Sequence, residues 1–168
     1  RDGRLAASGA VDSDLLEALL AHPYFARRPP KTTGREVFGR DFLEALWQRA
    51  RARGLPPEDV VATVTALTAH AIARAYRAFL PTFPDEVILS GGGVHNPVLV
   101  GMLRDLLAPA VVLTTDDVGI PVDTKEALSF ALLAYETWHG RVGNMPAATG
   151  ARHSVILGSI TPQAGRMR

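Results

Sequence analysis

The stretch that most constrains the fold is residues 87–97, where a short apolar run leads into Gly91, Gly92 and Gly93 and then into Asn96 and Pro97. Asn is a preferred helix N-cap because its side-chain oxygen accepts a hydrogen bond from a backbone N–H of the first turn. Pro is tolerated at the first helical position because its missing N–H would have no partner there. The pattern therefore predicts a strand, a glycine turn and a helix.

Such a turn is a candidate ligand site. Residues without Cβ allow positive φ and let a ligand approach the backbone, and the following helix directs its dipole and N–H groups at the turn. Nucleotides bind in this way at the carboxyl ends of strands in α/β sheets. However, no Gly-Lys-Ser/Thr follows, and Asn96 stands where GxGxxG would have its third glycine. From this stretch alone, a nucleotide site and a plain turn are equally supported.

The rest of the chain predicts a helix-rich α/β protein. A second apolar run at 110–114 follows the helix predicted at 97–107, which makes a β-α-β unit with strands typical of buried parallel sheets. Apolar stripes at helical spacing predict further helices at 12–22, 40–53, 57–80 and 124–139. A short strand is expected at 154–158.

Two of these helices carry specific predictions of burial. In helix 57–80 the expected stripe is Val60, Val64, Leu67, Ala71, Ala75 and Phe79, broadened by Val61, Ile72 and Tyr76. In helix 124–139 the expected apolar face is Ala127, Leu128, Ala131, Leu132, Tyr135 and Trp138. Both faces should pack against the core.

Composition narrows the classes of function. The 168 residues are 47% hydrophobic and 21% charged, which suits one globular domain. The formal net charge of +1 does not favour nucleic acid or an anionic membrane as partner. The chain has no cysteine, which suits a cytoplasmic protein and excludes thiolate chemistry. It also lacks the roughly 20 consecutive apolar residues of a spanning helix.

Several polar residues have two interpretations. Glu126 lies three residues after Asp123, a spacing that favours a capping box over contact with a ligand's hydroxyl groups. Asp116 and Asp117 follow the second strand and are interpreted as turn residues in preference to groups that orient a metal and phosphate. His95 either contacts a base or ribose or faces solvent.

The loop at 23–40 is basic, and its cations are Arg27, Arg28, Lys31 and Arg35. It could reach toward an anionic substrate. We favour a solvated connection in which Tyr24 and Phe25 close the edge of the core, because basic loops are common on surfaces.

Distributed motifs identify a family. The segments that carry the resemblance are 24–27, 29–36, 90–97, 125–131, 143–151 and 157–158. Together, and in this order, they resemble the carboxyl-terminal half of anhydro-N-acetylmuramic acid kinases. The resemblance implies a ribonuclease-H-like, actin-like ATPase second domain, with its first strands missing. Residues 1–168 would be a partial carboxyl-terminal nucleotide-binding domain of a two-domain kinase.

The resemblance also implies an activity. The family phosphorylates 1,6-anhydro-N-acetylmuramic acid with ATP and Mg²⁺, and water opens the anhydro ring to give N-acetylmuramic acid 6-phosphate in cell-wall recycling. Gly91, Gly92, Gly93 and Asn96 match the superfamily's adenosine motif. Glu126 matches a position that contacts the sugar, which reverses the preference for a plain cap. No catalytic or metal-binding residue is assigned in this chain.

The family's phosphate loop and catalytic aspartate precede the matched region, so we expect this chain to be inactive alone. The missing amino-terminal half is the expected partner, and a second copy of the chain is retained as another because two strands leave open edges. The alternative is a non-catalytic nucleotide-binding or structural remnant. A Rossmann-type dinucleotide binder is disfavoured, since no acidic residue stands in the right place about 20 residues on. The roles of Lys31, Arg35, His95 and Asp116 are left open.

Overall fold

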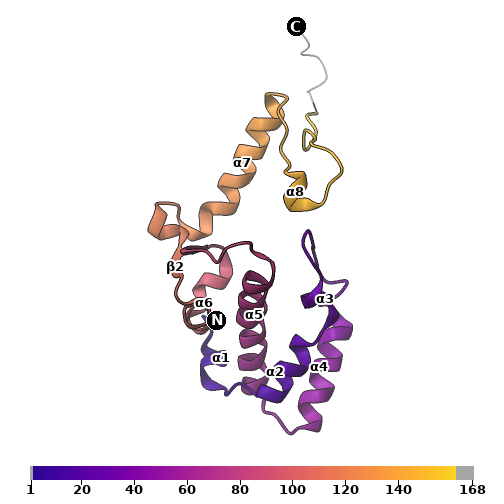
Figure 1. The fold of residues 1–168 in the computed structure, drawn as a ribbon, viewed down its shortest axis with the longest axis vertical. Coiled ribbons are helices and arrows are strands. Elements are labelled where there is room, and N and C mark those ends of the chain that lie inside the picture. The colour runs from indigo at the N-terminus through magenta and orange to yellow at the C-terminus, as the bar shows by residue number, and fades with distance from the viewer. Residues whose placement is uncertain (1, 162–168) are drawn as a thin grey trace.

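The computed structural model describes residues 2–161 and shows a helix-rich α/β fold with two parts (Figure 1). The first part, which we call the body, contains α1 (Arg4–Ser8), α2 (Ser13–Leu20), α3 (Pro23–Ala26), α4 (Arg40–Ala52), α5 (Pro57–Phe79), β1 (Glu86–Leu89), α6 (Pro97–Leu107) and β2 (Val111–Thr114). Short 3₁₀ turns lie at Gly92–His95, Thr115–Val118 and Val122–Thr124. The second part, the arm, runs from α7 (Lys125–Trp138) through α8 (Pro146–Thr149) to residue 161.

The sheet has two parallel strands, as the β-α-β pattern predicts, with Val87 paired to Val112. These two side chains face α5 and α6 and are buried. The opposite face is open among the described residues: Ile88 is 49% exposed and Val111 54% exposed. The strands have the composition of buried parallel strands, but helices cover only one face of this sheet among the described residues.

Helix α5 is central to the body, since it packs on α1, α2 and α6. On its α2 side lies a core of leucines from α2 with Leu46, Ala50, Val60 and Leu67. On its α6 side lies a second core, made by Ala69, Ala73, Val87, Leu103, Leu107, Ala110 and Val112. The two cores lie against one helix, so α5 ties the sheet to the amino-terminal helices.

The buried face of α5 differs from the predicted stripe. Val60 and Leu67 are buried as expected, but the other buried residues are Ala62, Thr63, Ala66, Ala69 and Ala73. Small side chains allow neighbouring helices to approach closely, so the alanine face makes the contacts and the larger Val64 and Phe79 lie at the margin. Hydrophobicity alone did not indicate this preference for size.

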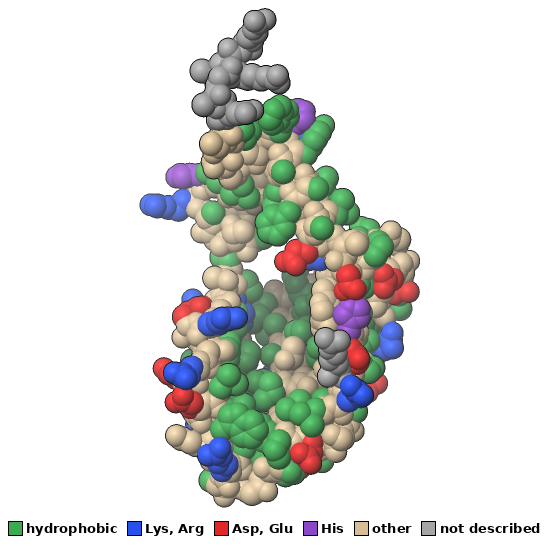
Figure 2. Space-filling view, turned by 180° about the vertical axis from the view of Figure 1, so that it is seen from behind, with side chains coloured by type: hydrophobic (Ala, Val, Ile, Leu, Met, Phe, Trp, Pro, Cys, Tyr) green, Lys and Arg blue, Asp and Glu red, His purple; other side chains and the backbone are tan. Residues whose placement is uncertain are grey.

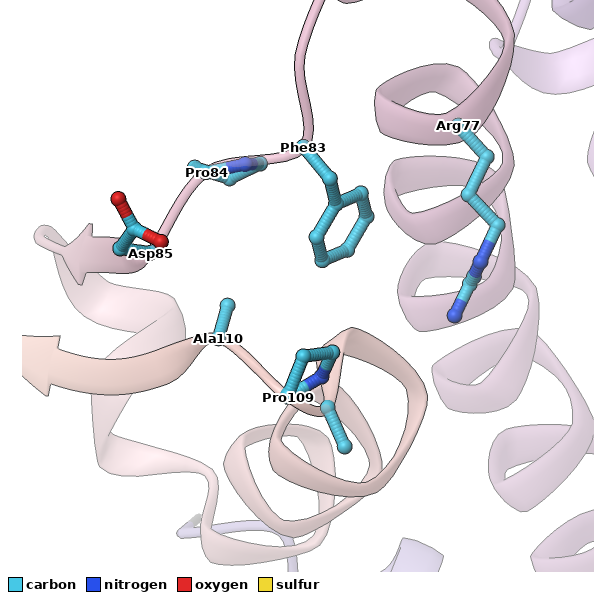
Figure 3. Close-up of a pocket in the computed structure, with 7 residues that line it drawn as sticks. Arg77, Phe83, Pro84, Asp85, Pro109 and Ala110 are labelled. Atoms are coloured by element: carbon cyan, nitrogen blue, oxygen red, sulfur yellow. The ribbon is translucent and has the colours of Figure 1, made fainter.

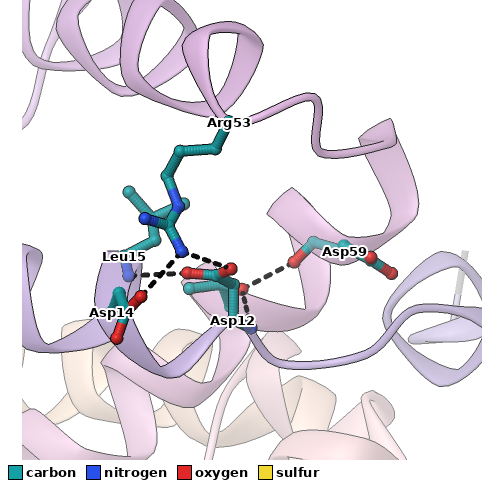
Figure 4. Close-up of polar contacts among 6 residues, drawn as sticks. Asp12, Asp14, Leu15, Arg53 and Asp59 are labelled. Carbon is teal, nitrogen blue, oxygen red and sulfur yellow. Dashed lines mark hydrogen bonds and ion pairs between the residues drawn. The ribbon is translucent and has the colours of Figure 1, made fainter.

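A polar network joins α2, α4 and α5 (Figure 4). Asp12 caps α2 as predicted: its Oδ1 accepts from the Leu15 N–H at 2.7 Å, and its Oδ2 accepts from Arg53 Nη2 at 3.0 Å. Arg53 also donates to Asp14 Oδ2 at 2.9 Å. The Leu15 N–H, and then Arg53, hold the pKa of Asp12 below its usual value. Ala10 N–H donates to Asp59 Oδ1 at 2.7 Å, which anchors the chain before α2 to α5.

The basic loop contains one turn of helix, α3, that the sequence did not indicate. Rings of His22, Tyr24, Phe25, Phe38 and Phe42 pack against one another there, with Phe25 and Phe38 stacked at 5.6 Å between centroids. Phe25 and Phe42 also contact the first core. The interpretation of this loop as a connection that closes the core edge is supported.

The arm buries little. Helix α7 forms where predicted, but none of its residues is buried, and its apolar face is open. The strand expected at 154–158 is absent, because this segment pairs with a loop: Val155 N–H donates to Asn144 Oδ1 at 2.7 Å, and Gly143 N–H donates to the Val155 carbonyl at 3.0 Å. One side-chain bond and one backbone bond therefore hold this segment against the loop in place of a sheet.

Candidate functional site

A small cavity of about 240 Å³ lies where the glycine turn meets the start of α7. It is lined by Gly91, Gly92, Val122, Asp123, Lys125 and Glu126. The turn follows the carboxyl end of β1, the edge at which open α/β sheets bind ligands. The structure thus brings Gly91, Gly92 and Glu126 together, although Glu126 is distant from the turn in sequence.

The glycine turn is open on its outer side. Gly91 has φ of +80°, a conformation that favours glycine, and a Cβ at either Gly91 or Gly92 would meet no protein atom within 4 Å. At Gly93 a Cβ would lie 3.6 Å from a methyl carbon of Leu99, so this residue faces α6. Within residues 2–161 the N–H groups of Gly92 and Gly93 make no hydrogen bond. They are donors available to a ligand.

Asn96 caps α6 as predicted, and its Oδ1 accepts from the N–H groups of Val98 at 3.1 Å and Leu99 at 3.2 Å. Pro97 has no N–H. The start of α6 therefore offers fewer donors than the sequence suggested, because its own cap occupies them. Asn96 does not line the cavity, and its amide group lies against Gly3.

The capping box predicted at Asp123 and Glu126 does not form. Helix α7 begins at Lys125 with Thr124 as its N-cap, and no side chain caps it. Asp123 lies in the preceding 3₁₀ turn, and Glu126 lines the cavity with its side chain exposed. The geometry leaves the Glu126 carboxylate open to a polar ligand.

Asp116 and Asp117 are turn residues, as favoured from the sequence. Asp116 Oδ1 accepts from the Val122 N–H at 2.9 Å. Asp117 Oδ2 accepts from the N–H and the hydroxyl of Thr114 at 2.7 and 2.8 Å, and these bonds hold its pKa below the usual value. Both carboxylates shape the chain between β2 and the cavity.

His95 is bonded to the far side of the cavity. Its Nε2 lies 2.7 Å from Asp123 Oδ1, in an exposed pair that joins the glycine turn to the segment before α7. The hydrogen bond to Asp123, and then the charge of Asp123, raise the pKa of His95 above its usual value. No local pattern could indicate this pair, because 28 residues separate its members.

Lys31 and Arg35 do not line this cavity. Lys31 Nζ donates to the carbonyls of Tyr24 and Phe25 at 3.3 and 3.1 Å, and it lies 4.9 Å from the ring centroids of Tyr24 and Phe79. Its ammonium group therefore stabilises the loop. The Arg35 side chain is exposed on the same loop.

A second cavity, of about 540 Å³, lies at the opposite end of the sheet, where β1 and β2 begin (Figure 3). Arg77 is its cation, but the guanidinium stacks on Phe83 at 5.6 Å and donates to the Leu106 carbonyl. The remaining lining is mostly apolar loop, with Asp85 at its edge. This cavity offers fewer convergent polar groups than the one at the glycine turn.

The described part of the chain has neither a cluster of metal ligands nor a helix that could span a membrane. Residues 2–161 hold no group of three or more His, Asp or Glu side chains arranged to ligate a metal ion. None of the helices in that range is both long and apolar enough to cross a membrane.

The family model and the similar proteins all point to one family. The family model described as anhydro-N-acetylmuramic acid kinase matches residues 1–163. Proteins of that name from Gloeobacter violaceus and a Cyanothece species are 51% and 49% identical over 162 and 158 residues, or 96% and 94% of this chain. One from Streptomyces avermitilis is 47% identical over 168 residues, or 99% of this chain. The matches cover 42% of each relative, so the chain spans about two fifths of their length.

Proposed function

The chain belongs to the anhydro-N-acetylmuramic acid kinase family, and on that premise we propose that it is the nucleotide-binding, carboxyl-terminal part of such a kinase. The complete protein would transfer a phosphoryl group from ATP to 1,6-anhydro-N-acetylmuramic acid and open its anhydro ring with water. The product, N-acetylmuramic acid 6-phosphate, would serve cell-wall recycling in the cytoplasm. The domain is proposed to have the ribonuclease-H-like, actin-like ATPase fold.

The observation that carries the proposal is the shared cavity of the open glycine turn and the Glu126 carboxylate. Gly91 and Gly92 let a nucleotide approach the backbone closely, and the N–H groups of Gly92 and Gly93 donate to it. Asn96 is proposed to support the turn by capping α6. Glu126 accepts hydrogen bonds from sugar hydroxyl groups, which orients the substrate beside the nucleotide.

ATP would supply the phosphoryl group, with a divalent ion to neutralise the charge that develops on transfer. Because residues 2–161 hold no metal-ligating cluster, we assign no metal contact to this chain. The general base for water is likewise not assigned here. Both are expected from the part of the relatives that this chain does not match.

Uncovered surfaces support the need for that other part. The outer face of the sheet and the apolar face of α7 are exposed, whereas parallel sheets are ordinarily covered on both sides. A cavity of about 240 Å³ is also smaller than the ~300–1,000 Å³ usual for small-molecule sites. We therefore propose that the site is completed, and catalysis made possible, by the amino-terminal part of the kinase.

Nucleotide binding is tested with Gly92→Ala. The fold has space for this methyl group, so the variant should unfold at the same urea concentration as the parent chain. A nucleotide against the turn would meet the methyl group, and calorimetry should show at least roughly tenfold weaker ADP binding, the loss of about 1.4 kcal/mol of contact.

The matched control is Gly101→Ala in α6, where a Cβ also meets no atom within 4 Å but the position does not line the cavity. Its ADP affinity should equal that of the parent chain. Equal affinities for all three proteins would contradict the assignment of Gly92, and absence of ADP binding by the parent would contradict the nucleotide site.

The kinase activity is tested by joining this chain to the part of the Gloeobacter violaceus relative that it does not match. The joined protein should phosphorylate the anhydro sugar with ATP, and Glu126→Gln should raise KM for the sugar more than KM for ATP. A folded joined protein without activity would instead support a non-catalytic remnant.

A further inference from the structure

The start of α7 carries Glu126 and Lys125 into the cavity, yet α7 itself packs no residue into the core. Its position over the glycine turn therefore depends on the short segment that precedes it. One link is Val122, which is buried and whose N–H donates to Asp116 Oδ1 at 2.9 Å. The second link is the His95–Asp123 pair.

The two links act at different places. The Val122 link fixes the segment to the chain that follows β2, on its own side of the cavity. His95 lies in the 3₁₀ turn Gly92–His95, so its bond to Asp123 connects the glycine turn directly to the segment before α7. Among the ion pairs of residues 2–161, it alone spans this cavity.

We propose that His95 and Asp123 are positioning residues: their pair sets the width of the cavity between Gly91–Gly92 and Lys125–Glu126. This rests on the proposed function, because it assigns a role in nucleotide and sugar positioning to a pair that contacts neither in this structure. In a kinase the two binding surfaces must hold their ligands at a fixed separation, and small displacements of reacting groups are costly.

The pair depends on pH. The groups that face His95 are carboxylates from three segments, namely Asp2 before α1, Asp116 after β2 and Asp123 before α7. All favour the protonated imidazole, so its pKa lies above the usual value of about 6.5. Below that raised pKa the protonated imidazole therefore forms an ion pair with the Asp123 carboxylate, and as pH rises through it the contact weakens to a hydrogen bond from a neutral imidazole to that carboxylate.

The first test needs no ligand. Hydrogen–deuterium exchange of residues 120–128 is compared among the parent chain, His95→Ala, Asp123→Ala and the double variant, at pH 6. Residues 120–128 should exchange several-fold faster in each variant than in the parent chain. The double variant should exchange no faster than either single variant, and the exchange rate of α5 should be the same in all four proteins. His153→Gln, on the exposed tail, is the matched histidine control. Unchanged exchange at 120–128 in both single variants would overturn the proposal.

The second test measures ADP affinity against pH. His95→Ala and Asp123→Ala should each bind roughly two- to fivefold more weakly at pH 6, a modest loss because exposed pairs couple weakly. His95→Gln, which keeps a neutral donor, should bind with intermediate affinity. The parent chain should bind ADP more tightly than His95→Gln at pH 6, and this difference in affinity should disappear as pH rises above the raised pKa of His95. Because ADP titrates equally in both experiments, its own titration does not affect the difference.

The two proposals fail in different ways. Absence of ADP binding by the parent chain, with the expected exchange pattern, would refute the nucleotide site but leave the pair as a link that positions α7. If the parent chain binds ADP normally but the losses of the two single variants add up in the double variant, His95 and Asp123 act independently. That result would refute the link and leave the nucleotide site intact.

Discussion

The body and the arm have similar apolar sequences but different surroundings. Helix α6 of the body buries Val100, Leu103 and Leu107 between the sheet and α5. Helix α7 of the arm presents an equally broad apolar face, and its largest side chains are exposed, with Phe130 at 66% and Trp138 at 72%. In the space-filling view, charged side chains lie mainly over the body, whereas hydrophobic side chains show on both parts (Figure 2).

This difference shows that an amphipathic pattern predicts a helix but not what covers it. The body supplies its own partners, because α5 lies against α2 on one side and α6 on the other. Within residues 2–161, α7 is contacted by the tail that follows it, where the Thr137 hydroxyl donates to the Leu157 carbonyl at 2.5 Å, and the tail itself lies close to Pro30 of the body at Gly150. An open apolar face of this extent is a feature of interaction surfaces.

The largest expected contrast comes from truncating one leucine in each part. Leu107→Ala removes a fully buried side chain and should lower the free energy of unfolding by about 2–5 kcal/mol. Leu132→Ala, at 56% exposure, should change it by less than about 0.5 kcal/mol. Urea unfolding followed by circular dichroism measures both, and similar losses would show that the arm is packed in solution.

Replacing an alanine by leucine should also lower the stability of the chain more in the body than in the arm. Ala69→Leu adds volume to the close packing of α5 and should cost about 1–3 kcal/mol. Ala131→Leu, on the exposed face of α7, should have almost no effect on the urea midpoint. A tolerated Ala69→Leu would mean that the second core is loosely packed.

The apolar arm can be tested without touching the body. Trp138→Glu should leave the free energy of unfolding within about 0.5 kcal/mol of the parent value. The same change should reduce fluorescence of a bound hydrophobic dye and any self-association seen by sedimentation. If dye binding does not fall, the apolar face of α7 is covered in solution, and the arm does not differ from the body in exposed apolar surface.

The smallest effect concerns acid stability. The pKa of Asp12 is below its usual value of about 3.8 in the folded chain, so its contribution is complete above that value and is lost as pH falls through the folded pKa. Asp12→Asn should therefore make stability less dependent on pH in this acid range. Asp105→Asn, an exposed carboxylate outside this network, is the control. Identical acid transitions for parent and Asp12→Asn would argue against the Arg53 network.

Much of the local structure was predictable. Helix α6 has the predicted bounds, and the Asp12 and Asn96 caps form as expected, because capping depends on residues two or three positions apart. The two strands and the helices α2, α4 and α5 lie within a few residues of their predictions, whereas the short helices α1 and α3 were not predicted. The motifs also identify the family correctly, since the family model matches residues 1–163.

Predictions that depended on contacts between residues far apart in the sequence were less accurate. The stripe on α5 was misplaced, since close contact with α1 and α6 selects small side chains over large ones. The capping box that spacing alone favoured at Asp123 and Glu126 does not form, because Asp123 lies in the preceding 3₁₀ turn and Thr124 is the N-cap of α7. The expected strand at 154–158 failed because the side chain of Asn144, and not a strand, bonds Val155.

By itself the sequence determined the longer helices, the two strands of the sheet, the two caps and the family, because these depend on spacing within a few residues or on motifs along the chain. Only the tertiary structure decided which apolar faces are covered and that Glu126 lies across a cavity from Gly91 and Gly92. Burial and cavities require two segments to meet in space, and a local pattern describes one segment at a time.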